Sequence, residues 1–323
     1  MILTNYKYIN FNYALMSILV KTENLTKNYG EINALKDFSI TIDSGAIGLL
    51  GPNGAGKSTL IKVLLGLTPT TSGRGTVFSY DIFRQGLLIR QRIGYMPEND
   101  CLLPDLNAVS YLTYLGQLSG LSASDAMQRA HEALYYVKIG DERYRELETY
   151  SSGMRQKVRL AQALLHDPDL IFLDEPTTGL DPTGRREMLG LIKGIVKDQG
   201  KNIIFSSHIL TDIEQVCDKV IIMNHGELIT IDSIKNLLFE KNPDLVVRIR
   251  GNSEKFISNL KAAGFQPVKR RNDILIKNAP LLSKSVIDIA ARTGVQLRYL
   301  NRSKHSLEEL FVKLIDQNES EEH

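Results

Sequence analysis

The stretch GPNGAGKST, residues 51–59, decides the fold of this chain. It matches the pattern G-x-x-x-x-G-K-[ST], in which Gly51, Gly56, Lys57 and Ser58 occupy the fixed positions. Glycines let the backbone turn tightly enough for successive N–H groups to face a phosphate, and the helix that follows directs its positive dipole end at the same anion. The stretch therefore predicts a phosphate-binding loop for a nucleotide.

The residues on both sides of this loop fit the order of strand, loop and helix that the pattern requires. Apolar residues 46–50 lead into the loop, and residues 58–67 (STLIKVLLGL) continue as a helix. Lys57 is expected to reach the β- and γ-phosphates and the Ser58 hydroxyl to ligate Mg²⁺. Nucleotide contacts are predicted for the whole loop: Gly51, Pro52, Asn53, Gly54, Ala55, Gly56, Lys57, Ser58 and Thr59. The alternative, an ordinary glycine-rich turn, is disfavoured by the four fixed residues.

Two adjacent carboxylates follow a second apolar run. The sequence LIFLDEP, residues 170–176, places Asp174 and Glu175 at the end of a predicted strand. Beside a phosphate-binding loop, this pair predicts Asp174 as a Mg²⁺ ligand and Glu175 as the group that activates or orients an attacking water. The alternative is an acidic turn before a proline, which is less favoured once the loop is present.

Apolar runs alternate with helical stretches up to about residue 235, which predicts an α/β fold. Buried parallel strands form continuous runs of Ile, Leu and Phe. Four such runs are present, at residues 93–96, 170–173, 203–206 and 220–223. Residues 17–22 and 38–42 alternate more, and His225-Gly226 separates residues 220–224 from residues 227–231 like a hairpin turn. A smaller antiparallel layer is therefore expected beside the mostly parallel sheet.

The pattern changes at about residue 240, where a small αβ unit is predicted. Its expected strands are residues 245–250, 274–277 and 295–300, and its expected helices are residues 253–263, 282–293 and 306–315. In the last helix, Leu307, Leu310, Phe311 and Leu314 share one face, which either packs on its own domain or makes a dimer or regulatory contact. The predicted domains are 1–16 (disordered extension), 17–238 (phosphate-binding-loop domain), 239–318 (αβ domain) and 319–323 (acidic tail).

Composition narrows the class of protein. The chain has 39 basic and 37 acidic residues, a formal net charge of +2 and no long basic run, so a nucleic-acid partner is not expected. Cys101 and Cys217 form neither a metal-spaced cluster nor a disulfide framework, which indicates a reducing, cytosolic setting. The longest uncharged stretch, residues 106–124, is predicted to be an amphipathic helix rather than a membrane span. Translation starts at Met1 or at Met16.

The segment YSSGMRQKVRLAQALLHDPDLIFLDEPTTGLDP, residues 150–182, resembles the ATP-binding subunits of ABC transporters, and the resemblance covers roughly residues 17–235. It implies a P-loop NTPase of ABC type, with antiparallel and helical subdomains on the core sheet. In that family a signature turn contacts the γ-phosphate of ATP bound to the opposite subunit, and here Ser151, Ser152 and Gly153 match it. The resemblance thus implies a head-to-tail dimer with two ATP molecules at its interface.

The resemblance assigns four further roles. Tyr29, in KNYG, matches the aromatic residue that stacks on adenine. Asp181, in GLDP, matches the aspartate that crosses the dimer interface, and His208, in SSHIL, matches the histidine near the γ-phosphate. Glu98, in IGYMPEND, stands where the family usually has a glutamine between the metal and the membrane partner. A carboxylate can still ligate Mg²⁺, but it adds negative charge near the phosphates.

The signature also departs from the commonest pattern, since Tyr150, Ser152 and Met154 stand where many members have Leu, Gly and Gln. This variant is similar to the branch whose permeases export drugs, ions, lipids or polysaccharides. The resemblance therefore implies an ATPase that binds ATP and Mg²⁺ and pairs with a second copy of itself or a related subunit. It would drive a separate polytopic permease from the cytoplasmic face of the cell membrane, for export.

Two alternatives stay open. One is an ABC-type ATPase that acts on nucleic acid or ribosomes, although the second ATPase module, coiled coils, zinc-binding cysteine pairs and basic arms of such proteins are not visible in the sequence. The other is a module that binds ATP only to dimerise, which Glu175 and His208 argue against.

Overall fold

The chain divides into two compact units, Met1–Ser233 and Ile234–His323. The computed structural model describes residues 18–99, 101–238, 244–271, 273–277 and 284–302, together with residues 308, 310–312 and 315. The predicted extension 1–16, the tail 319–323 and half of the predicted helix 306–315, including Leu307 and Leu314, lie outside these residues. The predicted boundary after residue 238 stays a prediction.

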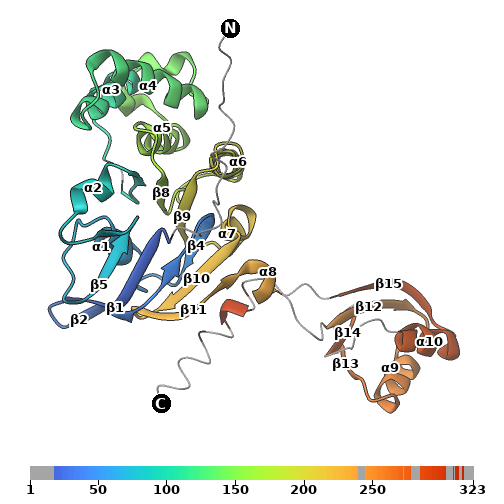
Figure 1. Ribbon diagram of the computed structural model, residues 1–323. Helices are drawn as coiled ribbons and strands as arrows, with labels where there is room; N and C mark the ends of the chain where they lie inside the picture. Colours follow the sequence, from blue (N-terminus) through green and yellow to red (C-terminus); the bar gives the residue numbers. More distant parts are fainter. Residues whose placement is uncertain are drawn as a thin grey trace, which may run out of the picture. The chain divides into compact units, whose positions relative to one another are not determined.

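A six-stranded sheet in the order β11-β10-β4-β9-β8-β7 forms the centre of the first unit (Figure 1). Its strands are β4 Ala46–Leu50, β7 Ile93–Met96, β8 Leu170–Asp174, β9 Asn202–Ser207, β10 Lys219–Asn224 and β11 Glu227–Ser233. All pairings are parallel except that of β10 with β11. Every residue of β4 and β8 is buried, as expected for strands covered on both faces. The α/β prediction and the hairpin at His225-Gly226 are confirmed.

A five-stranded antiparallel sheet forms the second layer. Its strands are β1 Val20–Tyr29, β2 Ile32–Phe38, β3 Thr41–Ile42, β5 Ser72–Val77 and β6 Tyr80–Asp81. The order is β2-β1-β5-β6, with β3 also paired to β1. The predicted smaller antiparallel layer is confirmed, but the β10–β11 hairpin that was expected to be part of it belongs to the central sheet. The predicted strand at residues 38–42 was wrong in detail, because β2 ends at Phe38 and β3 is a separate short strand.

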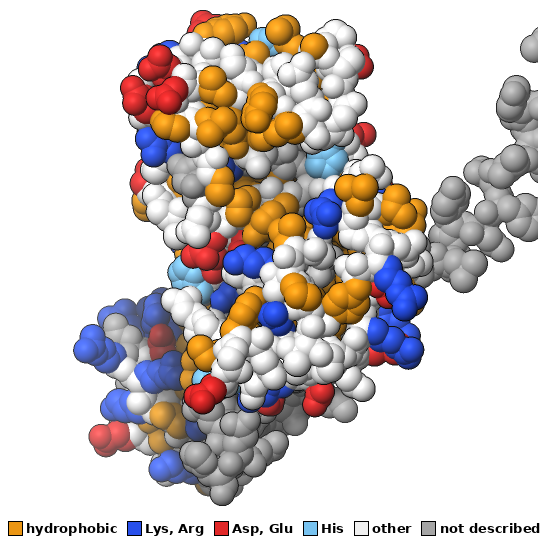
Figure 2. All heavy atoms as spheres, turned by 90° about the vertical axis from the view of Figure 1, so that its left-hand side faces the viewer, with side chains coloured by type: hydrophobic (Ala, Val, Ile, Leu, Met, Phe, Trp, Pro, Cys, Tyr) orange, Lys and Arg blue, Asp and Glu red, His pale blue; other side chains and the backbone are white. Residues whose placement is uncertain are grey.

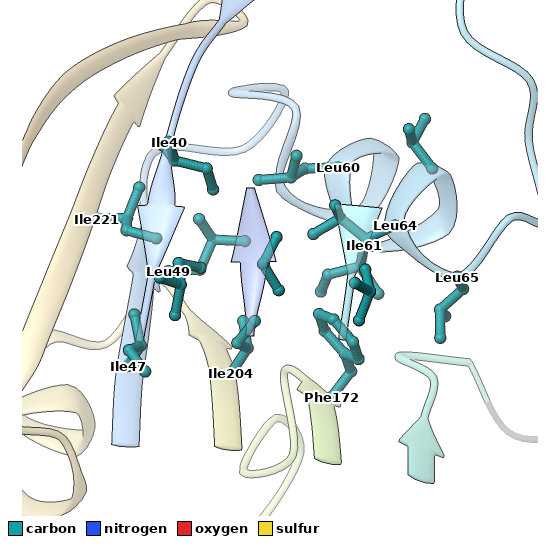
Figure 3. Packing of buried hydrophobic residues seen from close by; sticks show 14 of the residues in the cluster. Ile40, Ile47, Leu49, Leu60, Ile61, Leu64, Leu65, Phe172, Ile204 and Ile221 are labelled. Atoms are coloured by element: carbon teal, nitrogen blue, oxygen red, sulfur yellow. The ribbon is translucent and has the colours of Figure 1, made fainter. Parts of the chain in front are cut away.

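Helix α1, Lys57–Leu64, contributes to a hydrophobic core of the first unit. Its side chains Leu60, Ile61 and Leu64 are at most 2% exposed and share this core with Phe172 of β8 and Ile204 of β9 (Figure 3). Burial of each such side chain contributes roughly 1.5–3 kcal/mol relative to exposure. The start of α1, where the phosphate-binding loop ends, is therefore held in a fixed place.

Helices α3 Ala108–Leu118, α4 Ala123–Tyr136 and α5 Ser152–Leu164 form a helical group (Figure 1). The prediction of one helix over residues 106–124 was wrong, because α3 ends near Gly120, whose φ is 96°, and α4 begins after the cap Ser122. The remaining helices of this unit are α2 Gly86–Arg90, α6 Pro182–Lys197 and α7 Leu210–Val216. Within the described part of the chain, no helix has the length and apolar character needed to span a membrane.

The second unit begins with α8 Ile234–Leu237 and has a four-stranded antiparallel sheet of its own. Its further elements are β12 Leu245–Arg250, α9 Ser253–Ala262, β13 Gln266–Lys269, β14 Ile274–Lys277, α10 Lys284–Thr293 and β15 Gln296–Arg302, with the strands in the order β13-β14-β12-β15. A separate core joins Val247 and Ile276 of the sheet to Phe256 and Val286 of the helices. The αβ prediction is confirmed for these elements, whereas β13 was not predicted.

Candidate functional site: a nucleotide site at the end of the central sheet

The phosphate-binding loop connects the end of β4 to the start of α1. Gly56 has φ of 100°, and a side chain there would collide with the carbonyl oxygen of Ala34, so only glycine fits. The first turn of α1 contains no acidic residue, and no side chain caps it. Its N–H groups and positive dipole end therefore suit an anion, and a phosphate fits this loop.

The Lys57 side chain folds back onto the first residues of the loop. Only 7% of the residue is exposed, and its Nζ donates to the carbonyl oxygens of Gly51 at 2.8 Å and Pro52 at 3.1 Å. Desolvation lowers the pKa of Lys57, while the carboxylates of Glu175, Asp174 and Glu98 act in the opposite direction. The three predicted acidic residues are thus close enough to influence this lysine, and the phosphates of a nucleotide would favour its charged form.

Asp174 and Glu175 occupy the end of β8. Asp174 is buried, and its Oδ1 accepts a hydrogen bond from Ser206 Oγ at 2.8 Å. Glu175 has φ of 52°, a left-handed conformation that is strained for a residue with a side chain, and its N–H donates to the Ser206 carbonyl oxygen at 3.1 Å. The neighbouring strand β9 therefore fixes both carboxylates.

Glu175 and His208 are in direct contact. His208 Nδ1 lies 2.8 Å from Glu175 Oε2, and Thr178 Oγ1 donates to the same oxygen at 3.2 Å. The Glu175 side chain is 9% exposed, whereas that of His208 is 49% exposed. The predicted catalytic residues are thus brought together, with the histidine open to solvent.

The donors at this site suit Mg²⁺. The predicted ligands Ser58, Asp174 and Glu98 offer hydroxyl and carboxylate oxygens, which this hard cation prefers, and phosphate oxygens would complete its shell. Glu98 follows β7 and is exposed. In the part of the chain that the structure describes, no three His, Cys, Asp or Glu side chains form a metal-binding cluster by themselves.

Tyr29 ends β1 and exposes its ring. The residue is 46% exposed, and Lys27 Nζ lies 4.6 Å from the ring centroid. An exposed aromatic ring at the end of a strand suits stacking on a base. The role of Tyr29 at adenine stays a prediction.

The signature residues lie at the N-terminus of α5. Ser151 caps this helix by accepting a hydrogen bond from the Met154 N–H at 3.3 Å, and both Ser151 and Ser152 are exposed. The unusual Tyr150 is buried, and its hydroxyl donates to the Glu142 carbonyl oxygen at 2.6 Å. Tyr150 therefore anchors the turn, while the serines remain accessible to a ligand.

Asp181 is exposed and caps α6, since its Oδ1 accepts from the Gly184 N–H at 3.1 Å. Its predicted role across a dimer interface stays a prediction.

Two residues of the site, Ser206 and Thr178, were not predicted from the sequence. Thr178 could have been found because it follows Glu175 by three residues. Ser206 could have been found because it ends a predicted strand that lies beside the strand of Asp174.

Fold and site together define a P-loop nucleoside triphosphatase. Residues 35–178 match the protein family described as ABC transporter. The linearmycin resistance ATP-binding protein LnrL of Bacillus subtilis is 32% identical over 305 residues, which cover 92% of this chain and 98% of that protein. The bacitracin transport ATP-binding protein BcrA of Bacillus licheniformis is 33% identical, with coverages of 93% and 98%.

A dimeric structure of the ATP-binding cassette MJ0796, in a post-hydrolysis state with ADP and Pi, matches with a TM-score of 0.61. It is 25% identical and covers 67% of this chain and 98% of that one. The chain belongs to the ABC transporter family and is an ATP-binding subunit of this kind, an ATPase that uses ATP and Mg²⁺. Proteins of this family work as dimers with membrane permeases.

Proposed function

We propose that this chain hydrolyses ATP to drive export through a separate polytopic permease, from the cytoplasmic face of the cell membrane. The observation that carries the ATPase part is the Glu175–His208 pair, which lies beside Lys57 at the end of the central sheet. Export is supported by the relatives, two of which are named for linearmycin resistance and bacitracin transport. Because these matches span 98% of each relative, transport is better supported than action on nucleic acid.

The proposed binding roles follow from the positions of the N–H groups, the exposed ring of Tyr29 and the side-chain oxygens. The N-terminus of α1 and Lys57 hold the phosphates, and Tyr29 stacks on the adenine. Ser58, Asp174 and Glu98 hold Mg²⁺, which neutralises charge on the β- and γ-phosphates when it is bound. The hydrogen bond from Ser206 keeps Asp174 oriented.

The proposed chemistry is an in-line attack of water on the γ-phosphorus. As the new P–O bond forms, the bond to the leaving ADP oxygen breaks and the water proton passes to Glu175. Glu175 is fixed for this step by β9 and Thr178, while the exposed His208 contacts the γ-phosphate and keeps the carboxylate aimed. Both residues thus act as one unit.

The proposed partner in catalysis is a second ATPase subunit, identical or related. Ser151, Ser152 and Gly153 lie at an accessible helix N-terminus that suits the γ-phosphate bound by the other subunit. Asp181, which caps α6, would reach across the interface to the second subunit, either by giving up its capping hydrogen bond or while keeping it. ATP thus joins the subunits, and hydrolysis separates them.

Exposed hydrophobic side chains support docking of the permease on one face. Those of α2, the turn before it and the segment through α3 are between 41% and 67% exposed: Phe83, Leu87, Leu88, Leu103 and Leu118. Figure 2 turns this side of the molecule to the viewer and shows hydrophobic side chains at the surface across its middle. Exposed apolar side chains of this kind are typical of protein interfaces.

The test is phosphate release and size-exclusion chromatography of the wild type beside Glu175→Gln. The wild type should turn over ATP, and Glu175→Gln should lose at least about a hundredfold in kcat while forming a stable ATP-bound dimer. Glu187→Gln, a surface carboxylate paired with Lys157, is the matched control and should behave as the wild type. Equal turnover of Glu175→Gln and wild type would refute the role of Glu175, and salt-sensitive DNA or RNA binding would favour the nucleic-acid alternative.

A further inference from the structure

A buried carboxylate outside the nucleotide site joins three segments of the first unit. Asp212, in the first turn of α7, has a fully buried side chain. Its Oδ2 accepts a hydrogen bond from Thr177 Oγ1 at 2.7 Å, and its Oδ1 accepts from Arg185 Nε at 2.7 Å. Arg185 also donates to Thr211 Oγ1 at 2.9 Å. Both oxygens of Asp212 are therefore used, one for each of two other segments.

Each of the joined segments carries a residue of the proposed mechanism. Thr177 is 2% exposed and stands two residues after Glu175, in the loop that leaves β8. Arg185 lies in the first turn of α6, the helix that Asp181 caps, and its N–H donates to the Asp181 carbonyl oxygen at 2.9 Å. Asp212 itself follows His208 by four residues. One carboxylate thus fixes the loops of Glu175, Asp181 and His208 relative to one another.

Stability alone is a poor explanation for this arrangement. The Asp212 carboxylate is fully buried and the Arg185 side chain is 29% exposed, and removing a carboxylate from water costs free energy that attraction to a partner often only balances. A buried polar network does, however, specify one geometry, because any displacement leaves a charged group without its hydrogen bonds. The Glu175–His208 contact of 2.8 Å needs such a fixed geometry, since Glu175 also has the strained φ of 52°.

We propose that Asp212 is a positioning residue for hydrolysis, which acts through Thr177 and Arg185 to hold Glu175 opposite His208. This inference rests on the proposed function, in which Glu175 and His208 are the catalytic residues. The hydrogen bonds of Asp212 join it to Thr177 and Arg185 and not to the loop of residues 51–59, so we expect ATP to bind when this network is lost. Loss of the network therefore lowers kcat and leaves ATP affinity in place.

The test compares Thr177→Val with Thr177→Ser in the full chain. Valine keeps the shape of threonine but removes the hydroxyl that Asp212 binds, whereas serine keeps it. Thr22→Val is the matched control, because Thr22 is also 2% exposed and its hydroxyl donates to the Phe38 carbonyl oxygen at 2.8 Å in the antiparallel sheet. All three variants are assayed for kcat, for the Kd of ATP and for urea unfolding, at a temperature where each is folded.

Thr177→Val should lower kcat at least about tenfold with a Kd for ATP within about twofold of wild type. Thr177→Ser should restore kcat, and Thr22→Val should lose stability without losing kcat. If Thr177→Val does not fold, Asp212→Asn takes its place, since it keeps the shape of the side chain and removes the charge that Arg185 binds.

Two results would overturn the proposal. One is that Thr177→Val and Thr22→Val have the same kcat, which would show that the network serves stability and not hydrolysis. The other is an equal loss of kcat and ATP affinity, which would mean that the network supports the whole site. If Glu175→Gln abolishes turnover in the same assay, either result refutes only the role of Asp212. If Glu175→Gln turns over normally, the proposed function fails as well.

Discussion

Among single residues, Lys57 combines a function with a cost to folding. Desolvation is the largest influence on this lysine and lowers its pKa from the ordinary value of 10.5. A lysine whose pKa is lower in the folded than in the unfolded state opposes folding while it is charged, and this opposition fades as the pH rises through the lowered pKa towards 10.5. Desolvation of Lys57 therefore opposes folding of the nucleotide-free protein, and its hydrogen bonds to the carbonyl oxygens of Gly51 and Pro52 offset this in part.

We expect Lys57→Met to raise the thermal midpoint of the nucleotide-free protein at pH 7 and to abolish ATP binding. The gain in stability should shrink as the pH approaches 10.5. Lys62→Met, an exposed lysine on the same helix, is the control and should change neither property. Scanning calorimetry at several pH values and ATP titration measure both effects, and a lower midpoint for Lys57→Met would contradict the argument.

Residues that are contiguous in a motif were predictable, and residues that meet only through the fold were not. The loop at residues 51–59 and the pair Asp174 and Glu175 each lie within one short stretch, so their chemistry follows from spacing. The bond between Thr177 and Asp212 joins side chains 35 residues apart. Its existence depends on how α7 packs beside the end of β8, which no local pattern encodes.

At the scale of elements, the turn between β10 and β11 supports the phosphate-binding loop. Gly226 in this turn has φ of 84°, its N–H donates to the Ala55 carbonyl oxygen at 3.1 Å, and its own carbonyl oxygen accepts from the Lys36 N–H at 2.9 Å. A Cβ atom at Gly226 would lie 2.9 Å from the Ala34 carbonyl oxygen. The turn therefore leaves no room for a side chain.

We expect Gly226→Ala to lower the free energy of unfolding by at least about 2 kcal/mol, through the positive φ and the collision together, and to weaken ATP binding. Gly200→Ala is the matched control: its φ is 64°, no atom lies within 4 Å of an added Cβ, and it stands before β9. That variant should lose only about 1 kcal/mol and bind ATP normally. Urea unfolding and ATP titration give the comparison, and equal losses in the two variants would disprove the supporting role of the turn.

The elements themselves were predicted unevenly, for a physical reason. Strands β7, β8 and β9 are buried on both faces, so they form apolar runs that stand out in the sequence. Strands β5 (SGRGTV) and β13 (QPVK) are largely exposed and contain glycine or proline. Their place in a sheet depends on pairing with a neighbouring strand, and the side-chain pattern alone does not reveal it.

For the whole molecule, the separate cores of the two units predict two unfolding transitions. ATP and Mg²⁺ bind only the first unit, so at a concentration 100 times the Kd they should raise its stability by about 2.7 kcal/mol and leave the second transition in place. Phe256→Ala, in the core of the second unit, should cost about 3–5 kcal/mol there and leave the first transition unchanged. Calorimetry with and without nucleotide tests both statements, and a single transition that moves as a whole would show that the units unfold together.

The strand order of the central sheet also determines when its strands can pair while the chain is being synthesised. β4 is complete at Leu50 and is buried along its whole length, yet both of its neighbours, β9 and β10, are made only after residue 201. Until β9 is complete at Ser207 both edges of β4 lack their partners, and until β10 is complete at Asn224 one edge still does, a state in which chains aggregate. Assembly of the sheet is therefore a late, long-range event, although β4, the strand that leads into the phosphate-binding loop, is made early.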